Sequence, residues 1–158
     1  MNRLWRVLLW GLFLCYVLVM CEMLFGRPSM QGADYWAQVR ENLNLRPLHT
    51  VRMYLHLLQT NQPPGRVNAI MNLGGNVLLF TPIGLFFPVL LKKQRRSGYF
   101  FLTVVVMIVS VELIQLFALV GRFDVDDLLL NVLGAGVGFV IFRLWKWAMC
   151  RNTMGKVE

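Results

Sequence analysis

Four long apolar runs constrain what this chain of 158 residues can fold into. Each run holds about 20 residues, the length at which an α-helix crosses the hydrocarbon core of a bilayer. Hydrophobic residues make up 57% of the sequence, more than a soluble domain of this length usually carries. We therefore predict an all-α fold, a single membrane domain over residues 1–158. The predicted four-helix bundle has transmembrane spans at about 4–25, 67–91, 99–120 and 127–145.

The first run follows Arg3 and resembles the start of a secretory signal peptide. Its apolar stretch is longer than that of a signal peptide, and no cleavage site of small residues follows it. We therefore expect residues 4–25 to be retained as a transmembrane helix.

Ten of the 16 Lys and Arg residues fall on one side of the predicted bundle. Because basic residues gather on the cytoplasmic side of membrane proteins, both termini are predicted to be cytoplasmic and the loop 26–66 extracytoplasmic. Basic residues beside membrane spans also account for the net charge of +8 without a nucleic-acid partner. The ten residues are Arg3, Arg6, Lys92, Lys93, Arg95, Arg96, Arg143, Lys146, Arg151 and Lys156.

The loop 26–66 contains a helical pattern of its own, in which apolar residues recur on one face and polar residues on another. We expect an extracytoplasmic interfacial helix here, lying on the outer leaflet between spans one and two. Residues 61–65, which include two prolines, are expected to break this helix and turn the chain into the second span. The apolar face is Leu48, Val51, Leu55 and Leu58, and the polar face is His49, Arg52, His56 and Gln59.

Polar residues occur in the half of each span that is nearest the extracytoplasmic side. Such side chains are costly in hydrocarbon unless they are paired or hydrated, and a carboxylate is by default a candidate for function. Glu112 is expected about 12 Å below the outer end of its span, at about 1.5 Å per residue. The polar residues are Glu22, the pair Asn72 and Asn76, the pair Glu112 and Gln115, and the pair Asp127 and Asn131, each pair sharing one helix face.

Structural interpretations compete with functional ones for several of these residues. Asp124 or Asp126 is a candidate cap for the fourth helix, and the asparagines are candidates for hydrogen bonds between helices. Arg122, in the outer turn before that helix, is expected to pair with Glu112 or with an aspartate, because an unpaired charge is unfavourable there.

Three further patterns predict structure rather than chemistry. Residues 81–84 and Pro88 predict a kink or break in the second span. Gly134 and Gly138 form a small-x-x-x-small step that permits close helix packing. The cysteines have neither the spacing of a metal site nor that of a disulfide framework, and we expect them to be packing residues. They are Cys15, Cys21 and Cys150.

Over roughly residues 40–140, polar, proline and glycine residues follow one another in a distinctive order. They are Asn44, Leu45, Arg46, Pro47, Leu48, Asn72, Asn76, Phe80, Pro82, Gly84, Pro88, Ser110, Glu112, Gln115, Arg122, Phe123, Asp124, Val125, Asp126, Asp127, Asn131, Gly134 and Gly138. In this order and spacing the chain resembles the VanZ-like family. Arg46 departs from the pattern, since the family more usually has an apolar residue before this proline.

The resemblance implies a small bacterial protein, multi-pass in the cytoplasmic membrane. The founding member of the family is associated with resistance to teicoplanin and other lipoglycopeptide antibiotics, and the resemblance assigns no reaction. It also implies which polar positions are ligand-binding candidates. These are Asn72, Asn76, Glu112, Gln115, Arg122, Asp124, Asp127 and Asn131.

The first functional hypothesis is a non-enzymatic protein that confers low-level resistance to teicoplanin-type antibiotics by binding an amphiphile at the outer leaflet. Its predicted partners are membrane lipid and either a lipid-linked peptidoglycan precursor or the lipoglycopeptide itself. Glu112 would orient donors or accept from a sugar or amide, and Arg122 would bind a phosphate. Secondary candidates for the phosphate are His49, Arg52 and His56.

The alternative is a membrane enzyme that modifies a lipid-linked phosphate or peptidoglycan intermediate. Asp124, Asp126 and Asp127 would hold a divalent cation, with Glu112 as the base. This signal is weak, because acids at a helix start are common caps, and no Ser–His pairing, Gly-rich phosphate loop or Cys/His cluster supports it. We therefore favour a non-enzymatic protein with no metal or cofactor, and we assign no catalytic residue. A transporter is disfavoured because no inverted repeat is evident.

Overall fold

Four long helices form the body of the protein in the computed structural model, which describes residues 3–26, 34–60 and 63–154. Each of them is long and apolar enough to cross a membrane. Their outward faces expose large apolar side chains, such as that of Leu78, which is typical of helices that contact lipid. The protein is therefore a multi-pass membrane protein, and the predicted all-α membrane bundle is confirmed. The helices are α1 (Arg3–Phe25), α4 (Pro63–Leu90), α5 (Ser97–Phe117) and α6 (Val125–Met154).

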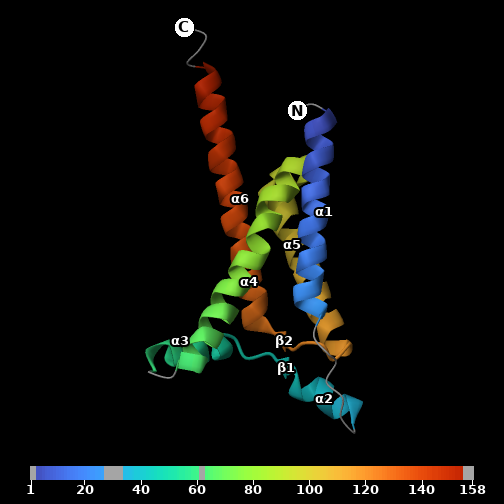
Figure 1. Cartoon of the computed structure of the whole chain (residues 1–158), viewed down its shortest axis with the longest axis vertical. Helices are drawn as coiled ribbons and strands as arrows, with labels where there is room; N and C mark the ends of the chain where they lie inside the picture. Colours follow the sequence, from blue (N-terminus) through green and yellow to red (C-terminus); the bar gives the residue numbers. More distant parts are fainter. Residues whose placement is uncertain (1–2, 27–33, 61–62, 155–158) are drawn as a thin grey trace.

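Short elements occupy the connections between the long helices. Figure 1 shows the start of α1 and the end of α6 at one end of the molecule, the termini end, as an even number of spans requires. The opposite end, which we call the α3 end, carries two short helices and a parallel pair of two-residue strands. The sequence predicted only one of these helices and neither strand. The elements are α2 (Tyr35–Glu41), β1 (Leu43–Asn44), α3 (His49–Gln59), the 3₁₀-helix η1 (Lys92–Arg95) and β2 (Phe123–Asp124).

Helices α4 and α6 cross with their backbones in direct contact. A Cβ atom added at Gly138 would overlap the carbonyl oxygen of Thr81, and one added at Gly134 would overlap that of Val77. Gly84 of α4 meets the backbone of α6 in the same way. Glycine is therefore required at these crossing points, and the close packing predicted for Gly134 and Gly138 is confirmed.

The prolines of α4 do not interrupt it. The helix is continuous from Pro63 to Leu90, with Pro82 and Pro88 inside it, so the predicted break is wrong. Neighbouring helices of a bundle supply the packing that lets a membrane helix tolerate an internal proline. The helix also begins at Pro63 within the predicted breaker, because a proline in the first turn loses no intrahelical hydrogen bond. Asn61 and Gln62 lie outside the described residues.

A core of aromatic and aliphatic side chains fills the interior between α4, α5 and α6. Phe100 stacks on Phe139 with 4.4 Å between ring centroids, and both rings pack in the same cluster as Phe80. Helix α1 lies at the side of the bundle and is attached through Tyr16, whose hydroxyl donates a hydrogen bond to the carbonyl of Leu79. The apolar centre separates the two ends of the bundle, so each end can be considered by itself.

Candidate functional site

The N-terminus of α3 is fixed by a carboxylate from the start of α6. Asp126 is fully buried and accepts hydrogen bonds from the backbone N–H groups of Leu48 and Val51. These are orphan donors of the first turn of α3, which has no capping side chain of its own. Leu48 adopts the left-handed conformation, with φ of 61°, to enter this arrangement. Asp126 therefore caps α3, not the fourth membrane helix for which it was a candidate.

Asp124 is the residue that caps α6, and it also ties α6 to the loop before α3. One carboxylate oxygen accepts from the backbone N–H of Asp126 at 2.9 Å, which is the capping interaction. The other accepts from the side-chain amide of Asn44 and from the hydroxyl of Thr50. The parallel pairing of β1 with β2 places Asn44 directly beside Asp124. Two segments about 80 positions apart in sequence are thus joined by one side chain.

The end of α5 is anchored through Gln115. Its side-chain amide donates to the carbonyl of Leu24 at 2.7 Å, near the end of α1. Its backbone carbonyl accepts from Val120 and Gly121, which closes the turn after α5. Leu119 takes a left-handed conformation, with φ of 54°, in this turn. The turn directs the chain into β2 and then α6.

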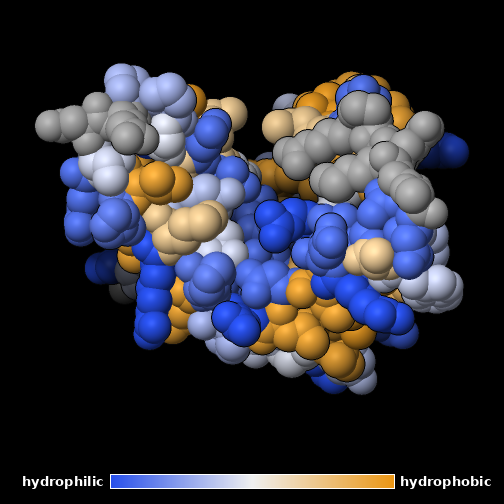
Figure 2. Space-filling view, turned by 90° about the horizontal axis from the view of Figure 1, so that it is seen from below, coloured by the Kyte–Doolittle hydropathy of each residue, from blue (hydrophilic) through white to orange (hydrophobic). Residues whose placement is uncertain are grey.

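These connections enclose a cavity of about 860 Å³ at the α3 end. Figure 2, which looks onto this end, shows hydrophilic residues gathered across a hollowed centre between two lobes. All eight ligand-binding candidates line the cavity, together with His49. Their role in binding stays a prediction, but the structure brings them to one place. The eight are Asn72, Asn76, Glu112, Gln115, Arg122, Asp124, Asp127 and Asn131.

The side of the cavity formed by α5 and α6 carries two buried oxygen atoms without a hydrogen-bond partner. Glu112 is 4% exposed and Asn131 is 3% exposed. Oε2 of Glu112 and Oδ1 of Asn131 accept no hydrogen bond. Asp127 beside them accepts from the amide of Asn76 at 2.6 Å, so that the second-span and fourth-span candidates are in contact. Buried polar groups are satisfied in most proteins, so these two oxygens are candidate acceptors for a water, an ion or a ligand.

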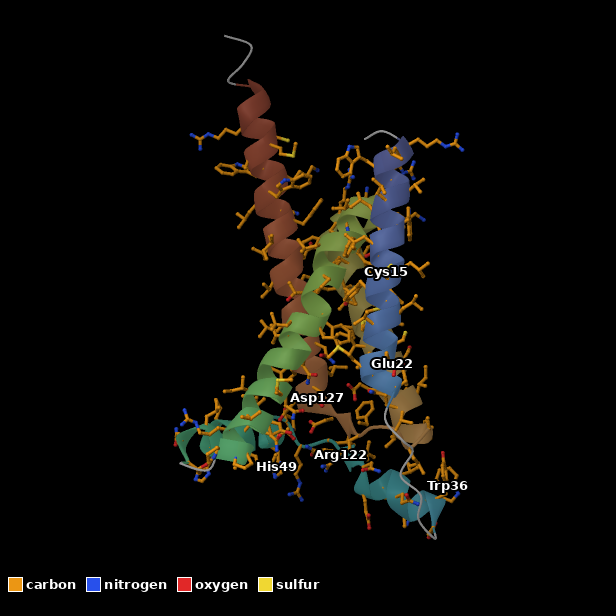
Figure 3. The ribbon with its side chains drawn as sticks, in the orientation of Figure 1. Cys15, Glu22, Trp36, His49, Arg122 and Asp127 are labelled. Carbon is orange, nitrogen blue, oxygen red and sulfur yellow. The ribbon has the colours of Figure 1, made fainter. Side chains whose placement is uncertain are left out.

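Arg122 differs from the prediction. Among the residues that the structure describes, no ion pair within 4.0 Å joins it to Glu112 or to an aspartate, although its charge acts on Asp127, and its side chain is exposed at the cavity wall. Figure 3 shows it at the α3 end, below Asp127. The residue lies in the turn outside α6, where water solvates the guanidinium and no partner is required. This leaves the five donors of the guanidinium available to a ligand.

Two of the secondary candidates lie away from the cavity. His49, in the first turn of α3, lines it, whereas Arg52 and His56 are exposed on α3 and do not. The three aspartates of the alternative hypothesis do not form a shared cation site either. Asp124 and Asp126 direct their carboxylates to separate backbone and side-chain donors. No group of three acidic, His or Cys side chains among the described residues is placed to hold a metal.

Several cavity residues were not predicted from the sequence. Thr50, Glu41 and Tyr54 come from the segment between the first two spans, where the only recognisable pattern was an amphipathic helix. Asn44 belonged to the family resemblance but was not a site candidate. No helical periodicity relates Asn44 to Asp124 in the sequence, because the two residues are joined by strand pairing and do not share a helix.

The family model described as VanZ/LLP1 matches residues 13–146. A search of curated proteins and a search of solved structures found no match. The matched range covers most of the chain and includes every residue that lines the cavity. The chain therefore belongs to the VanZ/LLP1 family, membrane proteins associated in general with glycopeptide resistance.

Proposed function

We propose that this protein confers low-level resistance to teicoplanin-type lipoglycopeptides by binding an amphiphilic ligand at the outer leaflet of the cytoplasmic membrane. The ligand is the antibiotic or a lipid-linked cell-wall precursor. The cavity at the α3 end is the observation that carries this proposal. Buried polar groups without a partner line it, and the apolar helices that form the bundle lie directly beside it.

The shape of the site suits a molecule with a polar head and an apolar tail. Binding sites for small ligands are typically about 300–1,000 Å³, and this cavity falls within that range at about 860 Å³. Met23 and Leu24 of α1 and Met53 of α3 add apolar surface to a wall that is otherwise largely polar. A head group bound among the polar residues would leave its tail free to lie along the lipid-facing surface of the helices.

The position of the site supports the outer leaflet. The positive-inside rule predicts that the termini end is cytoplasmic, and the cavity lies at the opposite end. A ligand presented at the outer leaflet would reach a site at the α3 end directly. Arg122 would bind a phosphate or carboxylate of such a ligand with its planar donor fork.

The test is antibiotic susceptibility of cells that express the protein with Glu112→Gln or with Arg122→Ala. We expect both variants to lose resistance, because one changes the buried acceptor and the other removes the exposed guanidinium. Glu22→Gln and Arg66→Ala are the matched controls, since neither residue lines the cavity. Membrane fractions would be probed for all four proteins to show equal insertion. Unchanged susceptibility in both cavity variants would remove the proposal.

A second measurement separates binding from the enzymatic alternative. Purified protein would be incubated with a labelled lipid phosphate, with and without divalent cations. Binding without turnover is the expected result, because the three aspartates near the start of α6 serve as caps and as a partner of Asn76. Cation-dependent release of product would instead favour the enzyme.

A further inference from the structure

The side-chain amides of three cavity residues already donate to other partners. Asn76 donates its amide to Asp127, and Gln115 donates to the carbonyl of Leu24. Asn72 donates back to the carbonyl of Asn68 on its own helix. The side chains best placed to satisfy Glu112 therefore point their donors elsewhere.

Two buried oxygen atoms in the cavity wall are left without a hydrogen-bond donor. They are Oε2 of Glu112 and Oδ1 of Asn131, on residues that are 4% and 3% exposed. Both residues line the cavity, one from α5 and one from α6. A buried acceptor without a donor loses its hydration and gains nothing in return, so a ligand that supplies donors gains more here than one that supplies acceptors.

The charges of the cavity wall favour the same kind of ligand. Four carboxylate residues line it, Glu41, Glu112, Asp124 and Asp127, against two arginines, Arg46 and Arg122. A net negative wall attracts a cation and repels an anionic group that tries to enter. Arg122 lies in the turn outside the helices and is exposed, so an anionic group would meet it at the rim and not beside Glu112.

From these observations we infer that the cavity selects a head group that donates hydrogen bonds, above all a primary ammonium, and seats it against Glu112 and Asn131 while an adjoining phosphate or carboxylate meets Arg122. This inference rests on the proposed function and names the chemistry of its ligand. A sugar hydroxyl shares the donor chemistry without the charge. A quaternary ammonium has the charge but no N–H to donate.

Short-chain phospholipids provide matched probes. Full-length protein would be purified in an amine-oxide detergent, which offers no hydrogen-bond donor that could occupy the cavity. Dihexanoyl phosphatidylethanolamine, phosphatidylglycerol and phosphatidylcholine would then be titrated, with thermal stability as the readout of binding. The three lipids share tail and phosphate. The ethanolamine head carries N–H donors and a positive charge, the choline head carries the charge without a donor, and the glycerol head carries hydroxyl donors without the charge.

We expect the ethanolamine lipid to bind about tenfold more tightly than the choline lipid, which is about the effect of one hydrogen bond that choline cannot donate. The glycerol lipid should fall between them. Glu112→Gln should remove most of the preference, because the neutral amide attracts an ammonium less strongly. Glu22→Gln should keep the preference intact. Because the wild-type ranking is itself a test, the inference does not depend on the variant being stable.

The outcomes distinguish the inference from the function on which it rests. Equal binding of all three lipids, or tightest binding of the glycerol lipid, would overturn the donor preference and leave amphiphile binding standing. Failure of every lipid to shift the thermal stability, together with unchanged susceptibility of the cavity variants in cells, would remove both.

Discussion

The two ends of this bundle treat their polar residues in opposite ways. At the α3 end several of them are buried and hydrogen-bonded between elements, while at the termini end the described Lys and Arg side chains are exposed. Of the buried polar residues, Gln94 alone lies at the termini end among those that the structure describes. The others are Asn42, Glu112, Gln115, Asp124, Asp126 and Asn131.

The difference shows which forces hold each end. Exposed basic residues beside a membrane span orient the chain across the bilayer and contribute little to its packing. Buried carboxylates that accept backbone hydrogen bonds fix the positions of helices, as Asp126 fixes α3. We therefore expect substitutions at the termini end to affect orientation, and substitutions at the α3 end to affect structure and binding.

The largest expected effect is in the accessibility of the two ends from outside the cell. In a chain with Cys150 as its sole cysteine, a membrane-impermeant maleimide should leave intact cells unlabelled. In a chain without native cysteines, Arg122→Cys should label fully. Both side chains are exposed, so burial does not explain a difference between them. Labelling in the reverse sense would place the cavity in the cytoplasm and remove the proposed function.

Asp126→Ala should cause the largest loss of stability. It leaves two backbone N–H groups at the start of α3 without their acceptor, and we expect a loss of about 3 kcal/mol from two hydrogen bonds to a charged acceptor. Denaturant unfolding measures the loss, and hydrogen exchange at Leu48 and Val51 should accelerate. Arg151→Ala at the termini end is the control, and an equal loss there would contradict the contrast between the ends.

The α4–α6 crossing links the two ends and gives a third test. Gly138→Ala should cost about 2 kcal/mol, because the added methyl overlaps the backbone of α4. Gly136→Ala is the matched control on the same helix, where the methyl would meet the ring of Phe101 at an ordinary 3.6 Å. Thermal unfolding of both variants measures the difference. A neutral Gly138→Ala would show that the crossing is looser than the structure has it.

How much of this the sequence could predict depends on the distance along the chain over which residues interact. Helical spacing and the family resemblance together located Asn72, Asn76, Glu112 and Asn131 at the same end, because each helix face is set by residues three or four positions apart. The apolar runs likewise gave the four long helices. Both kinds of prediction need only local regularity.

The interactions between distant segments could not be read in this way. Asp124 and Asp126 were both candidate caps of the fourth helix, and only Asp124 is one. Asp126 caps α3 instead, through Leu48 and Val51, which lie 78 and 75 positions away. Local sequence does not distinguish a carboxylate that caps its own helix from one that caps another. The ion pair within 4.0 Å that was expected for Arg122 is absent among the described residues for a related reason. Its side chain lies in an exposed turn, where an unpaired charge does not carry the free-energy cost that it has in hydrocarbon.

The smallest expected effect is that of Lys146→Gln at the termini end. Lys146 is exposed and beside a cavity of about 370 Å³ that it shares with Arg95 and Arg143. Because water can solvate the amine and neighbouring arginines repel it, we expect a change in unfolding free energy below about 0.5 kcal/mol. The same unfolding assay used for Asp126→Ala measures it. A loss as large as that of Asp126→Ala would mean that charge at this end also holds the helices together. The two ends would then not differ in how their polar residues contribute to stability.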